Sequence, residues 1–112
     1  MTTTIKPGDV VILRYPGAQK AKRRPGIAVS TDLYHATRPD VIVALVTTQF
    51  RGAVGPTDYI LQDWSAAGLR RASAFRAYLH MFVPVALRII GHLSDRDWLE
   101  VQARLRLALA VT

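Results

Sequence analysis

Glycine and proline occur about every ten residues over the first four-fifths of this chain, with clusters of β-branched residues between them. Short strands joined by turns have this pattern. The pattern therefore predicts a small, mainly β domain. We expect its strands at Asp9–Tyr15, Gly26–Ser30, Val41–Thr48, Asp58–Leu61, Ser73–Val83 and Leu87–Ile90.

Two of the expected strands are almost wholly apolar, over residues 10–13 and 41–46. Such strands are typically covered on both faces, and closure of a tightly curled sheet into a barrel provides that cover. A helix is expected over Asp95–Leu109, because Ser94 can cap it and Asp95 and Asp97 place carboxylates in its first turn. The predicted fold class is therefore α+β but mainly β, a barrel capped by a C-terminal helix, in a single domain spanning residues 1–112.

The charge of the chain indicates an anionic partner. Its 112 residues include 15 Lys and Arg against 8 Asp and Glu, a formal net charge of +7. Most of the cations are Arg, whose planar guanidinium suits phosphate, so nucleic acid is the first candidate. There is no Cys, and His35, His80 and His92 show no metal-ligand spacing, so we expect no metal or other cofactor. Without a signal-peptide layout or an apolar run near the ~18 residues that span a bilayer, a soluble, cytoplasmic protein is expected.

The most concentrated charge lies just before the second expected strand, where Lys20, Lys22, Arg23 and Arg24 precede Pro25. These cations repel one another and cannot pack, so the loop stays hydrated or meets an anion. Pro25 favours an extended backbone at Arg24, which makes Arg24 the most firmly held of the four. A solvated surface loop is the alternative interpretation.

The polar end of the apolar strand over residues 41–48 is a second candidate site. Thr47, Thr48 and Gln49 emerge there, where hydroxyl groups can donate to a phosphate oxygen. Threonine is also an ordinary strand former, which is the alternative. Arg51 follows in a segment that can form a flap over a substrate or a plain hairpin loop.

The strand expected from residue 73 alternates so that Arg76 and Tyr78 share a face. That face offers a guanidinium for phosphate and a phenol ring for stacking or hydrogen bonding. A surface arginine beside a half-buried tyrosine is the alternative. Specificity toward a nucleic acid is expected from loops at 31–39 and 49–56, which carry no readable code.

Five segments, taken in order and with their spacing, resemble the PemK/MazF family of toxin ribonucleases. The resemblance covers nearly the whole chain and is carried by Lys6–Val11, Lys22–Ser30, Val43–Gln49, Ala67–Leu69 with Ser73 and Arg76, and Ile90–Ser94. It implies a compact SH3-like β-barrel with a C-terminal helix, and a homodimer that cleaves single-stranded RNA without a metal. It also implies a type II toxin–antitoxin system, in which the toxin inhibits translation and growth and a cognate antitoxin protein neutralises it.

The resemblance also implies roles for particular residues. Arg24 matches the arginine of the family's Arg-Pro motif, Thr47 matches its strand-end threonine, and Arg76 falls where some members have a catalytic arginine. These are the predicted catalytic residues. The predicted RNA contacts are Lys20, Lys22, Arg23, Thr48, Gln49, Arg51 and Tyr78.

Two positions depart from the family pattern. The carboxylate that members often carry before the Arg-Pro motif is missing from Pro16–Lys20, and Tyr78 stands where a strand aspartate often occurs. The general base of a ribonuclease step is therefore unassigned. A barrel that binds RNA, an antitoxin or DNA gyrase without cutting is the alternative function.

Overall fold

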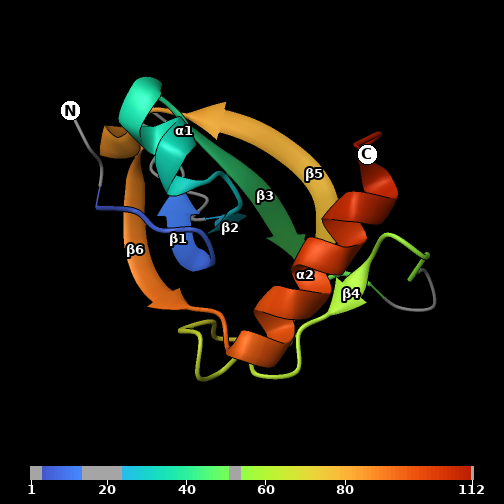
Figure 1. The fold of residues 1–112 in the computed structure, drawn as a ribbon. Coiled ribbons are helices and arrows are strands. Elements are labelled where there is room, and N and C mark those ends of the chain that lie inside the picture. The colour runs from blue at the N-terminus through green and yellow to red at the C-terminus, as the bar shows by residue number, and fades with distance from the viewer. Residues whose placement is uncertain (1–3, 14–23, 51–53, 112) are drawn as a thin grey trace.

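The computed structural model describes residues 4–13, 24–50 and 54–111. Its strands and helices are β1 (Asp9–Leu13), β2 (Pro25–Ala28), α1 (Asp32–Thr37), β3 (Val41–Thr47), β4 (Tyr59–Ile60), β5 (Ala74–Phe82), the 3-10 turn η1 (Pro84–Ala86), β6 (Leu87–His92) and α2 (Asp95–Ala108). The described strands form one antiparallel sheet in the order β4-β5-β3-β2-β1-β6 (Figure 1). None of the described helices has the length and apolarity needed to cross a membrane.

The expected strands agree with the observed ones to within one or two residues wherever both are described. Residues 14 and 15, the expected end of β1, lie outside the described part of the chain. Helix α2 begins at the predicted residue, because the Ser94 hydroxyl accepts a hydrogen bond from the Asp97 N–H at 3.3 Å and caps the first turn. The predicted mainly β fold with a C-terminal helix is confirmed.

Helix α1 was not expected, because its segment was assigned to a loop at 31–39. Thr31 caps this single short helix by accepting a hydrogen bond from the Tyr34 N–H at 3.1 Å, and Asp32 adds a carboxylate to its first turn. The buried His35 anchors the helix to the sheet through a 2.5 Å contact with the Ser30 hydroxyl, which also accepts from the Ile42 N–H. A six-residue helix is too short for a periodic pattern to reveal it.

The sheet is curled but not closed. Within the described residues, β4 and β6 are its two edges and no backbone pairing joins them. Strand β4 is only two residues long and does not pair with β6. Helix α2 packs against β4 and β5 on that side of the sheet (Figure 1). The expected barrel is therefore an open, curled sheet whose gap is covered by the C-terminal helix.

Both faces of the central strands are buried, as the apolar runs predicted. Val10 and Val11 are adjacent in β1 and each is fully buried, on opposite faces. The first face carries an apolar cluster with Ile27, Ala44 and Phe75, which is covered by Val101 of α2 and by residues of the loop after β4. The second face carries a separate apolar cluster that includes Leu13, Val43 and Leu45. We call these the helix-covered face and the second face of the sheet.

The loop after β4 packs tightly against β6. Gly68 has φ +91° and a Cβ there would overlap the Ile90 carbonyl oxygen, while a Cβ on Gly91 would overlap the Ala67 carbonyl oxygen. Glycine at both positions lets the two backbones meet. This contact fixes the residues that follow Gly68 relative to β6.

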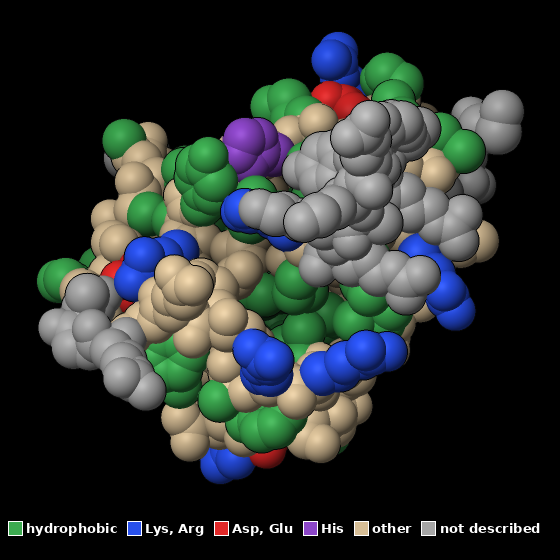
Figure 2. All heavy atoms as spheres, turned by 180° about the vertical axis from the view of Figure 1, so that it is seen from behind, with side chains coloured by type: hydrophobic (Ala, Val, Ile, Leu, Met, Phe, Trp, Pro, Cys, Tyr) green, Lys and Arg blue, Asp and Glu red, His purple; other side chains and the backbone are tan. Residues whose placement is uncertain are grey.

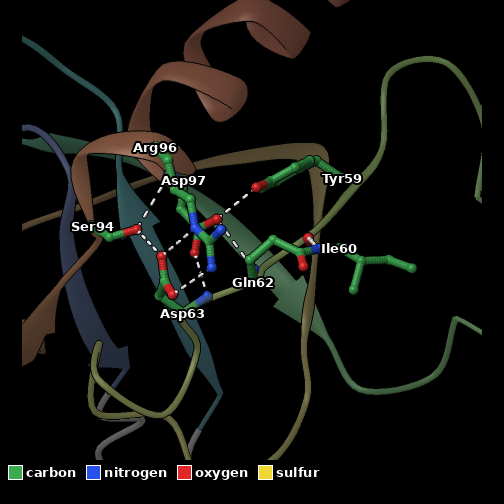
Figure 3. A network of polar contacts seen from close by, with 7 residues as sticks. All are labelled: Tyr59, Ile60, Gln62, Asp63, Ser94, Arg96 and Asp97. Atoms are coloured by element: carbon green, nitrogen blue, oxygen red, sulfur yellow. Dashed lines mark hydrogen bonds and ion pairs between the residues drawn. The ribbon is translucent and has the colours of Figure 1, made fainter.

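A polar network holds the beginning of the same loop to α2 (Figure 3). The fully buried Asp97 carboxylate accepts hydrogen bonds from the Tyr59 hydroxyl at 2.6 Å and from the backbone N–H groups of Gln62 and Asp63 at 3.1 and 2.8 Å. Asp63 in turn accepts from the Ser94 hydroxyl at 2.5 Å and from two guanidinium nitrogens of Arg96, each at 2.8 Å. The bonds from Arg96, then that from Ser94, lower the pKa of Asp63 to about 2. Burial, followed by the bond to Asp97, raises the pKa of Tyr59 above its ordinary range.

Candidate nucleic-acid interface

The register of β2 and β3 brings two predicted site residues across from each other. Gly26 of β2 pairs with Leu45 of β3. Continued by two residues in the same antiparallel register, this pairing brings Arg24, before Gly26, opposite Thr47, after Leu45. The Leu13 N–H donates to the Arg24 carbonyl oxygen at 3.1 Å, which fixes the Arg24 backbone between β1 and β3. Cα atoms directly opposite in an antiparallel pair lie roughly 5 Å apart. The exposed Arg24 side chain and the half-buried Thr47 side chain therefore belong to one face and one end of the sheet.

Thr47 ends β3 with a turn that its own side chain closes. Its Oγ1 accepts a hydrogen bond from the Gln49 N–H at 3.0 Å and lies 3.5 Å from the Gln49 carbonyl oxygen, to which it can donate. The hydroxyl is thereby held at the strand end, while Thr48 and Gln49 are exposed beyond it. Thr48 follows the last residue of β3 and lines the pocket described below.

Arg76 and Tyr78 lie in an irregular part of β5. Strand β3 pairs Ala44 with Leu79 and Val46 with Phe75, so residues 76–78 of β5 oppose Leu45 alone. Alternation is kept on either side, which places Arg76 and Tyr78 on the second face, the face of Thr47. Arg76 is half-buried and Tyr78 is 59% exposed.

The Tyr78 ring belongs to a row of rings on that face. The rings of Tyr78 and His80 meet edge to face with their centres 4.6 Å apart, and the Phe82 ring follows at 6.0 Å from His80. Aromatic rings exposed in such a row are platforms on which bases can stack. The other predicted RNA contacts, Lys20, Lys22, Arg23 and Arg51, lie outside the described residues.

A pocket of about 360 Å³ opens at the same end of the sheet. Its floor is apolar and includes Ile12, Pro25, Leu69 and Ile90. Arginine side chains surround it, from Arg70, Arg71 and Arg88, and Thr48 and Ser73 add hydroxyl groups. Figure 2 shows this side of the molecule, with a hollow over apolar side chains that is bordered by Lys and Arg side chains. No carboxylate is among the described residues that line the pocket, so it favours an anion.

Sequence reasoning assigned no role to these three arginines. The pair at 70–71 is visible as a short basic run, but Arg88 stands alone in its strand. They meet only because β6 pairs with β1 and because the loop after β4 packs on β6 at Gly68 and Gly91. Neither long-range contact has a signal in the local sequence pattern.

The one pair of histidine and carboxylate side chains in ion-pair contact within the described residues lies away from this interface. His92 Nδ1 is 2.7 Å from Asp9 Oδ1, and the Lys6 N–H donates to Asp9 Oδ2 at 2.8 Å. Asp9 begins β1, whereas Arg24 lies beside Leu13 at its other end, about 13 Å away at strand rise. No group of three His, Asp or Glu side chains within the described residues is arranged to hold a metal ion.

The chain is thus a small, mainly β domain, in which a curled antiparallel sheet with a C-terminal helix carries arginine and threonine side chains at the ends of β2 and β3. The sequence model of the PemK-like, MazF-like toxins of type II toxin–antitoxin systems matches residues 6–109. The chain therefore belongs to this family, which confirms the resemblance seen in the sequence. No curated protein sequence matches the chain.

Solved structures share the fold at low sequence identity. An endoribonuclease in complex with its cognate antitoxin, from a mycobacterial species, superposes with a TM-score of 0.77 at 16% identity, over 96% of this chain and 97% of that one. A MazE–MazF structure from Deinococcus radiodurans gives 0.73 at 16% identity, with the same coverage of both chains. The toxin MazF-mt6 of Mycobacterium tuberculosis gives 0.71 at 20% identity, over 93% of this chain and 98% of that one.

Proposed function

We propose that this toxin is an endoribonuclease that cleaves single-stranded RNA, mRNA included, without a metal and thereby inhibits translation and growth. The ribose 2′-OH attacks the adjacent phosphorus, the P–O5′ bond breaks, and the products carry a 2′,3′-cyclic phosphate and a 5′-OH. Such a step needs an acceptor for the 2′-OH proton, stabilisation of the charged phosphorane, and a proton donor for the leaving 5′ oxygen.

The catalytic roles proposed for this chain follow from its side chains. The Arg24 guanidinium stabilises the negative charge of the phosphorane, and the Thr47 hydroxyl orients the phosphate. Arg76 provides a second charge contact or donates the proton to the leaving oxygen. The RNA contacts are Thr48, Gln49 and Tyr78 together with Lys20, Lys22, Arg23 and Arg51.

The observation that carries this proposal is the register of β2 and β3. If the register continues two residues beyond the Gly26–Leu45 pair, Arg24 and Thr47 lie opposite each other on the face that also carries Arg76. A single phosphate can then contact both side chains. No carboxylate is among the described residues that line the adjoining pocket, and the Asp9–His92 pair lies at the other end of β1, so the proton acceptor is not assigned to a residue.

Membership of a type II toxin family supports a cognate antitoxin as the protein partner, with a toxin homodimer in the cytoplasm as the working assembly. The solved mycobacterial endoribonuclease was captured with its own cognate antitoxin. Growth arrest on expression of the toxin, rescued by co-expression of the reading frame next to its gene, tests this partner. Arrest that the neighbouring frame does not relieve contradicts it.

The cleavage proposal is tested with a mixed-sequence RNA in EDTA. We expect fragments that end in a 2′,3′-cyclic phosphate, and their loss in Arg24→Ala. Arg106→Ala is the matched control, because Arg106 is an exposed arginine in the last turn of α2 and lines no part of the interface. Circular dichroism checks that both variants stay folded. Unchanged cleavage by Arg24→Ala contradicts the assignment, and salt-sensitive RNA binding without fragments in the wild type supports the non-cutting module instead.

A further inference from the structure

We infer that the arginine-lined pocket is a nucleotide subsite, which holds a nucleotide next to the scissile one with its base on the apolar floor and its phosphate against the guanidinium groups. The inference rests on the proposed function, because the occupant is a part of the same single-stranded RNA. It assigns Arg70, Arg71 and Arg88 to RNA binding.

The pocket floor is built into the sheet. Ile12 of β1 pairs with Pro25 of β2 on one side and with Arg88 of β6 on the other, so the three residues form a row across neighbouring strands. This row lies on the helix-covered face, where Ile90 also packs. Since backbone pairing fixes every member of the row, the floor has one shape before any ligand arrives.

The other wall is held just as firmly. The loop backbone meets β6 where Gly68 and Gly91 leave no room for a Cβ, and Leu69 is 93% buried in the core next to them. On the far side, the Ser73 hydroxyl donates to the Arg71 carbonyl oxygen at 2.9 Å. Arg70 and Arg71 therefore leave a fixed backbone, while their side chains stay exposed and free to meet a ligand.

The chemistry of the lining fits a nucleotide. Guanidinium groups only donate hydrogen bonds, and they bind phosphate oxygens or stack on bases. The apolar floor suits the face of a base, and a volume of about 360 Å³ lies at the small end of the range of ligand pockets. An inorganic anion alone leaves the floor unused, and a folded protein does not enter a pocket of this size.

The place of the pocket connects it to the cleavage site. Thr48 directly follows Thr47 in the chain, and Pro25 directly follows Arg24. Thr47 and Arg24 belong to the proposed cleavage site, whereas Thr48 and Pro25 line the pocket. An RNA strand that passes over the ends of β2 and β3 thus contacts both, with neighbouring nucleotides on the two sides of the sheet end.

The first test measures RNA binding without cleavage. A fluorescein-labelled, mixed-sequence 2′-O-methyl RNA cannot be cut, and its affinity is measured by fluorescence anisotropy. We expect Arg70→Gln/Arg71→Gln and Arg88→Gln each to weaken binding by about tenfold. Arg106→Gln removes one positive charge, as Arg88→Gln does, but from α2, which contributes nothing to the pocket, and its affinity should stay within about twofold. Pocket variants that bind as tightly as Arg106→Gln overturn the inference.

The second test locates the ligand on the wild-type protein. Adenosine and guanosine 5′-monophosphate are titrated into ¹⁵N-labelled protein, and we expect shifted amide signals over residues 68–73 and 88–90. Inorganic phosphate should shift these signals much less, because it cannot use the floor. Equal shifts with phosphate, or no shifts in these segments, overturn the inference. Both tests are independent of cleavage, so a wild type that binds through the pocket but never cuts refutes the proposed function alone.

Discussion

Thr47 closes a turn of the fold and is also a residue of the proposed cleavage site. Its hydroxyl closes the turn after β3 by accepting from the Gln49 N–H, and it stands across from Arg24. We expect Thr47→Val, which keeps the branched shape but loses the hydroxyl, to reduce kcat by ~100-fold, the scale found when one transition-state hydrogen bond is removed. Thr47→Ser keeps the hydroxyl and should lose less than about tenfold. The cleavage rate of one RNA is measured under single-turnover conditions for the wild type, Thr47→Val and Thr47→Ser. A Thr47→Val variant as active as Thr47→Ser rules out a role for the hydroxyl.

At the residue scale, the sequence identifies a candidate site residue when the neighbouring residues in the chain already restrict its position. Arg24 was singled out because Pro25 restricts its backbone, and Thr47 because it ends an apolar strand. No local sequence pattern singles out Arg88, because its place beside the pocket depends on the pairing of β6 with β1, which sets Arg88 opposite Ile12. Residues whose role comes from a distant strand cannot be identified from spacing alone.

At the scale of elements, α2 and the loop after β4 are joined by the Asp63–Arg96 pair. Because the folded-state pKa of Asp63 is about 2, below its ordinary 3.8, the ionised form stabilises the fold above pH 3.8 and this contribution is lost as the pH falls toward 2. We expect Arg96→Gln to lower the urea midpoint at neutral pH, and the gap from the wild type to shrink between pH 3.8 and about 2. Arg106→Gln, on the same helix, is the control without this pair. A gap that does not change with pH contradicts the link to Asp63.

Elements with strong local patterns were predictable and those that depend on their surroundings were not. Strand β3 is marked by its apolar run, and α2 by the capping residue Ser94. Helix α1 has only one turn and a half, and its stability comes from His35 buried against Ser30. The gap between β4 and β6 was likewise hidden, because closure of a sheet depends on whether its two edge strands meet, and here α2 packs against β4 and β5.

Across the whole molecule, most of the described acidic side chains are engaged in ion pairs or in the buried network of Asp97. Ion pairs join Asp32 to Lys6, Asp40 to Arg38, Asp63 to Arg96 and Glu100 to Arg104, and Asp97 is buried in its network. Arg24, Arg70, Arg71 and Arg88 make no ion pair with any described residue. These four arginines therefore gather positive charge around the pocket and the strand end beside it, where it can attract a phosphate backbone.

This distribution of charge predicts a steep salt dependence of RNA binding. Each phosphate contact with a single strand contributes about −0.7 to the slope of log K against log salt, so Arg24 and the three pocket arginines together contribute about −3, and the other proposed cationic contacts make the slope steeper. We expect Arg24→Gln to make the slope less steep by about 0.7, because it removes one contact, and Arg106→Gln to leave it unchanged. Titration of the uncleavable 2′-O-methyl RNA at several salt concentrations measures all three slopes. Equal slopes for Arg24→Gln and the wild type mean that Arg24 does not contact a phosphate. The charge at the strand ends then attracts RNA without a direct contact between Arg24 and the backbone at the proposed cleavage site.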